Sequence, residues 1–170
     1  MPSVSGLGVN NRIRARERTV QAAELARHHR DQILYSQEAR PRWEGISKNL
    51  RARRGQFPKQ ADCSSFVTWC LWNGLFLRFG VDDIVNGQDW RAGFTGTLLD
   101  HGKRVRKVAN IRPGDLVHYD PDLPKFKSAH VTIFVRHQNG VPMVVSHGSD
   151  GCPCFTEYNY RPVREIRRYI

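Results

Sequence analysis

Cys63 follows Asp62 and opens a long apolar stretch that begins Cys-Ser-Ser-Phe-Val-Thr-Trp. Residues 63–79 are mostly Phe, Val, Trp, Leu and Cys, which predicts a helix buried on most of its sides. Asp62 is a suitable cap for the start of this helix. The N–H groups of a helix start favour a nearby negative charge, so we expect them to favour the thiolate. Cys63 is therefore a candidate nucleophile, with a buried core cysteine as the alternative.

A nucleophilic thiol needs a base within hydrogen-bond reach and a polar group that orients the base. His130 and His147 lie in two stretches of alternating residues that are joined at Asn139-Gly140. This pair favours a tight hairpin turn. If the two strands pair across that turn, the two histidines can face each other. His130 is then the candidate base, and His147 is the candidate orienting group.

Each histidine has an alternative interpretation. A strand histidine is often satisfied by a hydrogen bond in the core, and a histidine at a strand end is often a polar cap. If His147 does not orient His130, then Ser146, Ser149 or Asp150 could take its place. Cys70 lies two helical turns after Cys63, and we expect it in the core.

The elements that must position these residues fall into two groups along the chain. We expect helices at about 16–35 and 63–79, with a long connection between them that holds one short helix near 46–53. One or two short helices follow within 81–102. Strands are predicted at 104–108, 115–119, 129–136, 142–147 and 161–169. Helices followed by strands indicate an α+β fold.

The length of 170 residues suits one domain, which we place at 16–170 behind a flexible basic arm at 1–15. The N-terminal segment is basic and has no apolar block after it, so we expect no signal peptide. No stretch has the length of a transmembrane helix. We therefore expect a soluble cytosolic monomer with reduced thiols and no disulfides.

The chain is strongly basic, because its 27 Lys and Arg residues outnumber its 16 Asp and Glu residues. A net charge of +11 indicates a negatively charged partner, which could be nucleic acid, a cell-wall polymer or acidic lipid headgroups. The basic residues are not interleaved with the aromatic residues of a base-stacking surface. We therefore expect no specific nucleic acid, and charge alone does not choose between an anionic cell-wall polymer and lipid headgroups.

Four motifs occur in an order that resembles a known family. The stretches DCSSFVTW, IRPGDLVHYD, AHVTIFV and VVSHGS are similar to the motif series of NlpC-type papain-like cysteine peptidases of the bacterial cell wall, which include phage endolysins. The resemblance covers roughly residues 60–150. It implies a papain-like fold in which N-terminal helices, with the nucleophile at a buried helix start, pack on an antiparallel sheet.

The resemblance also implies roles for single residues. It assigns the nucleophile to Cys63, the base to His130 and the third, polar residue to His147. Tyr35 is the candidate for the tyrosine that often lies upstream of the nucleophile. The remaining candidate contacts with substrate are Asp62, Ser64 and His118, of which Asp62 has helix capping and His118 has a core position as the alternative.

The residue types also allow a zinc site to be considered, since His147, Cys152 and Cys154 are possible ligands. The Cys-Pro-Cys spacing is tighter than the usual spacing of zinc ligands, and no second clear pair follows. We therefore predict no metal and no cofactor, and we place both cysteines in a loop.

The resemblance implies a peptidoglycan hydrolase that cuts an amide bond of the stem peptide. The expected setting is a phage endolysin that stays in the host cytoplasm until lysis and then acts on the wall, and a bacterial or tail-associated hydrolase is an equal alternative for that setting. Two alternatives remain open at this point. One is an amidase of the cysteine–histidine amidohydrolase class, which cuts between glycan and peptide. The other is a non-enzymatic basic module that binds the wall or nucleic acid and keeps Cys63 only as a core residue.

Overall fold

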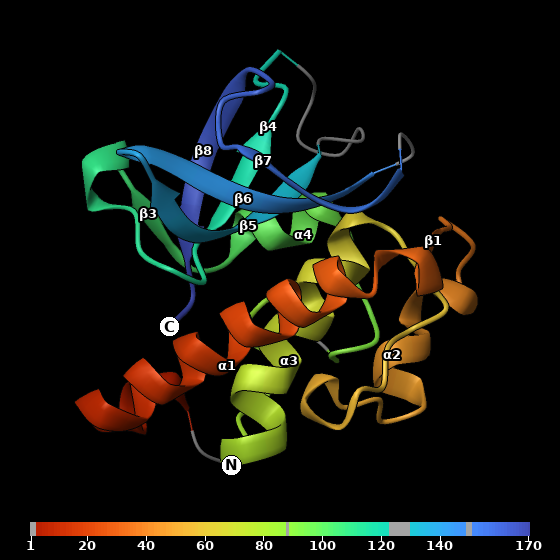
Figure 1. Ribbon diagram of the computed structural model, residues 1–170. Helices are drawn as coiled ribbons and strands as arrows, with labels where there is room; N and C mark the ends of the chain where they lie inside the picture. The colour runs from red at the N-terminus through yellow and green to blue at the C-terminus, as the bar shows by residue number, and fades with distance from the viewer. Residues whose placement is uncertain (1–2, 88, 123–129, 149–150) are drawn as a thin grey trace.

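In the computed structural model, helices and a six-stranded sheet pack against each other (Figure 1). The structure describes all residues except 1–2, 88, 123–129 and 149–150. The side chain of residue 152 also lies outside the described part. The α-helices are α1 (Val9–His28), α2 (Glu44–Ser47), α3 (Cys63–Phe79) and α4 (Thr95–Asp100). The short 3-10 turns are η1 (Val4–Gly6), η2 (Arg30–Gln32), η3 (Pro41–Trp43), η4 (Ala52–Arg54) and η5 (Val108–Asn110).

The strands form two sheets. Strands β1 (Leu34–Tyr35) and β2 (Gln60–Ala61) form a short parallel pair. The larger sheet is antiparallel and has the order β3-β8-β4-β5-β6-β7. Its strands are β3 (Lys103–Val105), β4 (Leu116–Tyr119), β5 (Val131–Gln138), β6 (Val141–Gly148), β7 (Gly151–Glu157) and β8 (Val163–Arg168). Helices followed by an antiparallel sheet confirm the α+β prediction.

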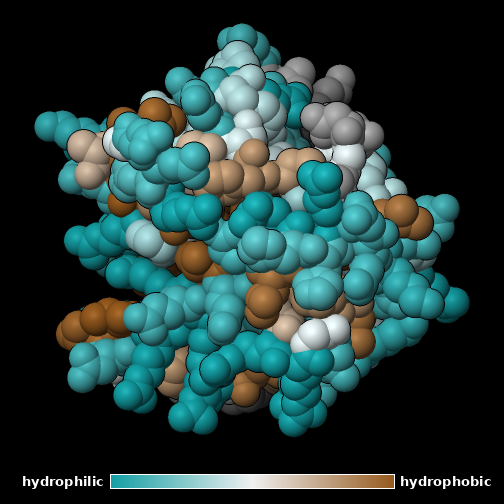
Figure 2. All heavy atoms as spheres, viewed as in Figure 1, coloured by the Kyte–Doolittle hydropathy of each residue, from teal (hydrophilic) through white to brown (hydrophobic). Residues whose placement is uncertain are grey.

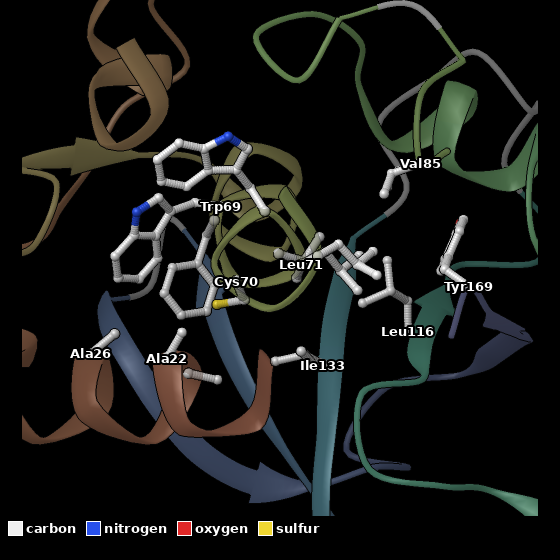
Figure 3. Packing of buried hydrophobic residues seen from close by; sticks show 14 of the residues in the cluster. Ala22, Ala26, Trp69, Cys70, Leu71, Val85, Leu116, Ile133 and Tyr169 are labelled. Carbon is white, nitrogen blue, oxygen red and sulfur yellow. The ribbon is translucent and has the colours of Figure 1, made fainter. Parts of the chain in front are cut away.

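Helix α3 is buried along its first thirteen residues, Cys63 to Leu75. Its start is capped by Asp62, and it ends at Gly80, which takes the left-handed conformation and donates its N–H to Phe76. Figure 3 shows Cys70 of this helix among apolar side chains, with Ala22 and Ala26 of α1 close by. Cys70 is fully buried, which confirms its predicted place in the core.

Helix α1 begins earlier than the sequence pattern suggested. Residues 9–15, which we assigned to a flexible arm, form its first two turns. The apolar signal there is weak, because the residues that α1 buries are small. They include Ala15 and Thr19, which pack so closely on Gly74 of α3 that a side chain at Gly74 would collide with both. The arm prediction was therefore wrong for these two turns.

The sheet contains one strand that we did not predict. Residues 151–157 form β7, whereas we placed Cys152 and Cys154 in a loop. Pro153 suggested that loop, because proline cannot donate to a sheet ladder. β7 lies at the edge of the described sheet, next to β6, and edge strands tolerate proline.

The β5–β6 hairpin turns at Asn139-Gly140, as predicted, and both residues have positive φ. The register nevertheless shifts between Phe134 and Arg136, which leaves Val135 as one extra residue in β5. Beyond this bulge, Thr132 pairs with Ser146 rather than with His147. Side chains alternate along a strand, so the bulge exchanges the faces on which Ser146 and His147 lie.

His118 lies in the core and does not line a cleft, which corrects its prediction as a substrate contact. It is completely buried on β4 opposite Val131, and among the described residues neither of its ring nitrogens has a hydrogen-bond partner. Burial lowers the pKa of His118 to about 3, and the positive charges of Arg167 and Arg164 act in the same direction. The imidazole is therefore neutral in the folded protein at neutral pH.

This burial predicts a specific loss of stability in acid. The folded-state pKa lies below the unfolded value of about 6.5, so the contribution of His118 is complete above about pH 6.5 and declines as the pH falls toward 3. At about pH 5, the need to keep His118 neutral should lower the free energy of unfolding by about 2 kcal/mol. Urea unfolding at about pH 7.5 and about pH 5 should show a smaller acid loss in His118→Phe. The exposed His28→Gln control should behave as the wild type, and an equal loss in His118→Phe would contradict this account.

Candidate active site

Cys63 is the first residue of α3 and is held there by a closed set of hydrogen bonds. Asp62 Oδ1 accepts from the backbone N–H of Ser65 at 2.7 Å, and the Ser65 hydroxyl accepts from the Asp62 N–H at 2.9 Å. This reciprocal pair is a capping box. Ser64 Oγ also donates to Asp62 Oδ1, at 2.9 Å. The capping arrangement fixes the helix start and hence the position of the thiol.

Arg42 completes the surroundings of Asp62. Its Nη1 donates to Asp62 Oδ2 at 2.7 Å, and its Nη2 donates to the carbonyl oxygen of Gly93 at 3.1 Å. Gly93 precedes α4, whose first residue, Thr95, lies beside the thiol with Oγ1 3.9 Å from Cys63 Sγ. One guanidinium thus joins the helix start to the segment that carries Thr95.

No pattern in the sequence identified Arg42 or Thr95 as part of the site. Arg42 is one of many arginines, and Thr95 lies among glycines in a region that showed only a weak helical pattern. Only the fold brings residues 42, 62 and 95 together.

The thiol itself is buried and protonated. Burial raises the pKa of Cys63 to about 11, and the neighbouring negative charge of Asp62 acts in the same direction. Hydrogen bonds from the backbone N–H groups of Val131 and Ser64 and from Thr95 favour the thiolate but are outweighed. We expected the N–H groups of the helix start to determine the pKa of Cys63. The structure corrects this expectation, because removal of the thiol from water raises the pKa by more than the helix start lowers it.

His130 lies next to the residue whose backbone contacts the thiol. It directly precedes Val131, and its carbonyl oxygen accepts from the N–H of Tyr119 at 3.0 Å. His130 Nε2 and Ser146 Oγ are 2.8 Å apart, and Ser146 Oγ and the Tyr160 hydroxyl are 3.0 Å apart. The imidazole is also flanked by the rings of Tyr119 and Tyr160. The ring of His130 is thus held through Nε2 and by its aromatic neighbours.

His147 lies on the other face of β6, toward α3. Its Nε2 is 3.0 Å from the carbonyl oxygen of Ala61, which only accepts, so Nε2 carries the proton. The ring contacts Phe66 and Tyr35, with centroid distances of 5.4 Å and 5.7 Å. The structure therefore places His147 against the segment that leads into Cys63, whereas Ser146 takes the position on His130 Nε2. Ser149 and Asp150 lie outside the described residues.

The residues predicted to contact substrate lie partly near the start of α3 and partly in the core. Tyr35 lies on β1 opposite Ala61, and its hydroxyl accepts from Gln37 at 2.8 Å. It is therefore close to the start of α3. Ser64 is 2% exposed and Asp62 is 5% exposed, with their side chains engaged in the helix cap. The structure thus places Asp62 and Ser64 in the helix cap beside the thiol, Tyr35 against Ala61 and His147, and His118 in the core.

No group of three or more His, Cys, Asp or Glu side chains within the described part of the chain could hold a metal ion. The side chain of Cys152, one of the considered zinc ligands, lies outside the described part of the structure. None of the described helices has the length and apolar character that crossing a membrane requires.

Comparisons with known proteins give a structural likeness but no sequence family. No protein-family model matches the chain, and no curated protein matches it. A solved structure of NlpC1 from Trichomonas vaginalis is similar over 89% of this chain and 44% of that protein, with 20% identity and a TM-score of 0.50. NlpC2 from the same organism matches over 89% of this chain and 46% of its own, with 19% identity and a TM-score of 0.49.

The chain thus spans less than half the length of either protein. The likeness to NlpC1 concerns the fold, because the identity is low. It agrees with the element order observed here, in which a helix that begins at a cysteine precedes an antiparallel sheet. The chain has an α+β fold of the NlpC type.

Proposed function

We propose that the protein is a thiol hydrolase that cuts an amide bond in the stem peptide of peptidoglycan. One observation carries the proposal: the thiol at the capped start of α3 is hydrogen-bonded to the backbone beside His130, and the ring of His130 is held by Ser146. A nucleophile, an adjacent base and a group that orients the base are the parts that thiol catalysis needs. The choice of peptidoglycan rests on the resemblance of the four motifs and on the basic charge of the chain.

In the proposed reaction, His130 takes the proton of the Cys63 thiol as the sulfur attacks the carbonyl carbon of the scissile amide. The backbone N–H of Cys63, which the helix leaves without an intrahelical acceptor, donates to the oxyanion. His130 then gives its proton to the leaving amine, and the C–N bond breaks. Water hydrolyses the thioester and restores the thiol. Because burial keeps the resting thiol protonated, His130 acts as a general base and not as a preformed imidazolium.

We assign the orienting role to Ser146 and a positioning role to His147. Ser146 Oγ has Nε2 of His130 on one side and the Tyr160 hydroxyl on the other, so the ring is held from strand β6. The bond of His147 to Ala61 fixes the two residues that precede the nucleophile. Tyr35 packs on the outer side of that contact.

The proposed setting is a phage endolysin that accumulates in the host cytoplasm and reaches the wall at lysis. The basic charge supports attraction to anionic wall polymers. An amidase that cuts between glycan and peptide would use the same thiol chemistry, and the released fragments distinguish the two reactions. Burial of Cys63 favours the remaining candidate, a binding module without activity.

Digestion of purified peptidoglycan tests the proposal directly. The wild type should release fragments with new amino groups from stem peptides, and Cys63→Ala should release none. His130→Ala should lose a factor of about 100 to 10,000, the usual contribution of a general base. Mass spectrometry of the fragments identifies the bond. Cys70→Ala, at a buried cysteine remote from His130, controls for loss of a thiol. Equal release by wild type and Cys63→Ala would reject a thiol mechanism, and no release from several wall types would favour the binding module.

The raised thiol pKa predicts how alkylation of Cys63 depends on pH. In the absence of substrate, the rate with iodoacetamide should rise about tenfold per pH unit from about pH 7 to about pH 10, because the reactive thiolate increases in that proportion. Peptide mapping by mass spectrometry separates Cys63 from the other cysteines. A rate that is already constant between about pH 6 and about pH 8 would instead show a preformed thiolate–imidazolium pair.

Two neighbouring substitutions separate the roles of Ser146 and His147. Ser146→Ala should lower kcat about tenfold or more, because the His130 ring loses its hydrogen bond and its orientation. His147→Gln keeps a donor for Ala61 and should stay within about twofold of the wild type. Steady-state hydrolysis of a soluble stem peptide measures both, and thermal unfolding monitors the fold. The reverse ranking would return the orienting role to His147.

A further inference from the structure

A cavity that is separate from the candidate active site lies toward the other end of α3. It has a volume of about 830 Å³ and is lined by α1, η4, the end of α3 and part of the sheet. Five arginines line it. Arg16 donates to the carbonyl oxygen of Ile170, and the other four are Arg14, Arg18, Arg53 and Arg78. We call this cavity the arginine pocket. Arg78 follows Cys63 by 15 residues along α3, which corresponds to roughly 22 Å.

The close packing of α1 on α3 brings the four arginines together. Gly74 allows the helices to approach at Ala15 and Thr19, where a larger residue would collide. Arg14 and Arg18 directly precede these two contact residues, and Arg78 follows Gly74 by one turn. The turn η4, which contains Arg53, also packs on α1. The grouping of charge is therefore a result of the close contact between α1 and α3 at Gly74.

These four side chains repel one another and are not neutralised by carboxylates. None of them takes part in an ion pair within the described part of the chain. Arg18 is half-buried, and its burial lowers its pKa, as do the charges of Arg53, Arg78 and Arg14. The pocket also contains Glu17, whose single negative charge is smaller than the sum of the four positive charges.

The composition of the lining favours one class of anion. Guanidinium groups form paired hydrogen bonds with phosphate oxygens, so a group of arginines suits an anion with several phosphates. The apolar part of the lining is aliphatic and includes Val20 and Val135. Among the described residues, the lining has no aromatic side chain on which a nucleobase could stack. Figure 2 shows mainly hydrophilic side chains over α1 on the face in view.

We propose that the arginine pocket binds an oligophosphate or a short run of a polyol-phosphate chain, without recognition of bases. The site does not depend on the proposed hydrolase activity. If the substrate of the hydrolase is carried on a wall that contains such chains, the pocket would hold the enzyme on that wall while Cys63 acts elsewhere on the surface.

Binding of sodium tripolyphosphate to the full chain tests this proposal. Isothermal titration at about 50 mM salt should detect binding to the wild type. The double variant Arg18→Gln with Arg53→Gln should weaken it about tenfold or more, since two of four guanidinium groups are lost. The matched control is Arg40→Gln with Arg54→Gln, which removes the same charge from two exposed arginines outside the pocket and should change binding less than about twofold.

Thermal unfolding gives an independent readout that also controls for misfolding. Without ligand, the pocket variant should unfold at the same or a higher temperature than the wild type, because the repulsion is relieved. Tripolyphosphate should raise the midpoint of the wild type and not that of the pocket variant. The pocket variant should also cleave a soluble stem peptide at the wild-type rate. Failure of the oligophosphate proposal can therefore be distinguished from failure of the hydrolase proposal.

Two results would overturn the proposal. Equal weakening in both double variants would show attraction by net charge alone. Tighter binding of a single-stranded or duplex oligonucleotide than of tripolyphosphate or poly(glycerol phosphate), lost in the pocket variant, would show a nucleic-acid surface instead of an oligophosphate site.

Discussion

Burial of α3 along most of its length determines where the other parts of the molecule can lie. The helix has α1 on one side and the sheet on another, and the small residues of α1 allow the two helices to approach at Gly74. A helix enclosed in this way cannot slide or rotate without opening the core. Its first residue is therefore held as firmly as its centre. The cost is that Cys63 is withdrawn from water, which raises its pKa instead of lowering it.

The class of fold and the place of the candidate nucleophile at a helix start could both be predicted from the sequence. The apolar stretch after Asp62 predicted α3, and the alternating stretches predicted most strands of the sheet. The start of α1 was missed because Ala15 and Thr19 are buried by close contact and carry little apolar signal. Strand β7 was missed because Pro153, which an edge strand of the described sheet can accommodate, resembles a loop signal.

The site was predicted in part, and the missing part depends on contacts between distant segments. The cap at Asp62 follows from local sequence, and His130 lies at the start of a strand that was expected. The partners Arg42 and Thr95 come from segments with no recognisable motif. The pairing of Ser146 with His130 depends on the bulge at Val135, which the alternating pattern of β5 did not reveal. A regular ladder from the same turn would have placed His147 on that face.

The bulge at Val135 has a consequence for how such a site can change during evolution. Which side chain of β6 faces His130 depends on whether Val135 is paired in the ladder or left out as a bulge, and not only on the residue at one position. If Val135 entered the ladder as an ordinary paired residue, the same Asn139-Gly140 turn would pair Thr132 with His147 and bring that side chain to the face of His130, whereas deletion of Val135 would leave Thr132 paired with Ser146. A hydroxyl and an imidazole can therefore exchange this position through loss or gain of the bulge at constant strand length, with no substitution of either residue.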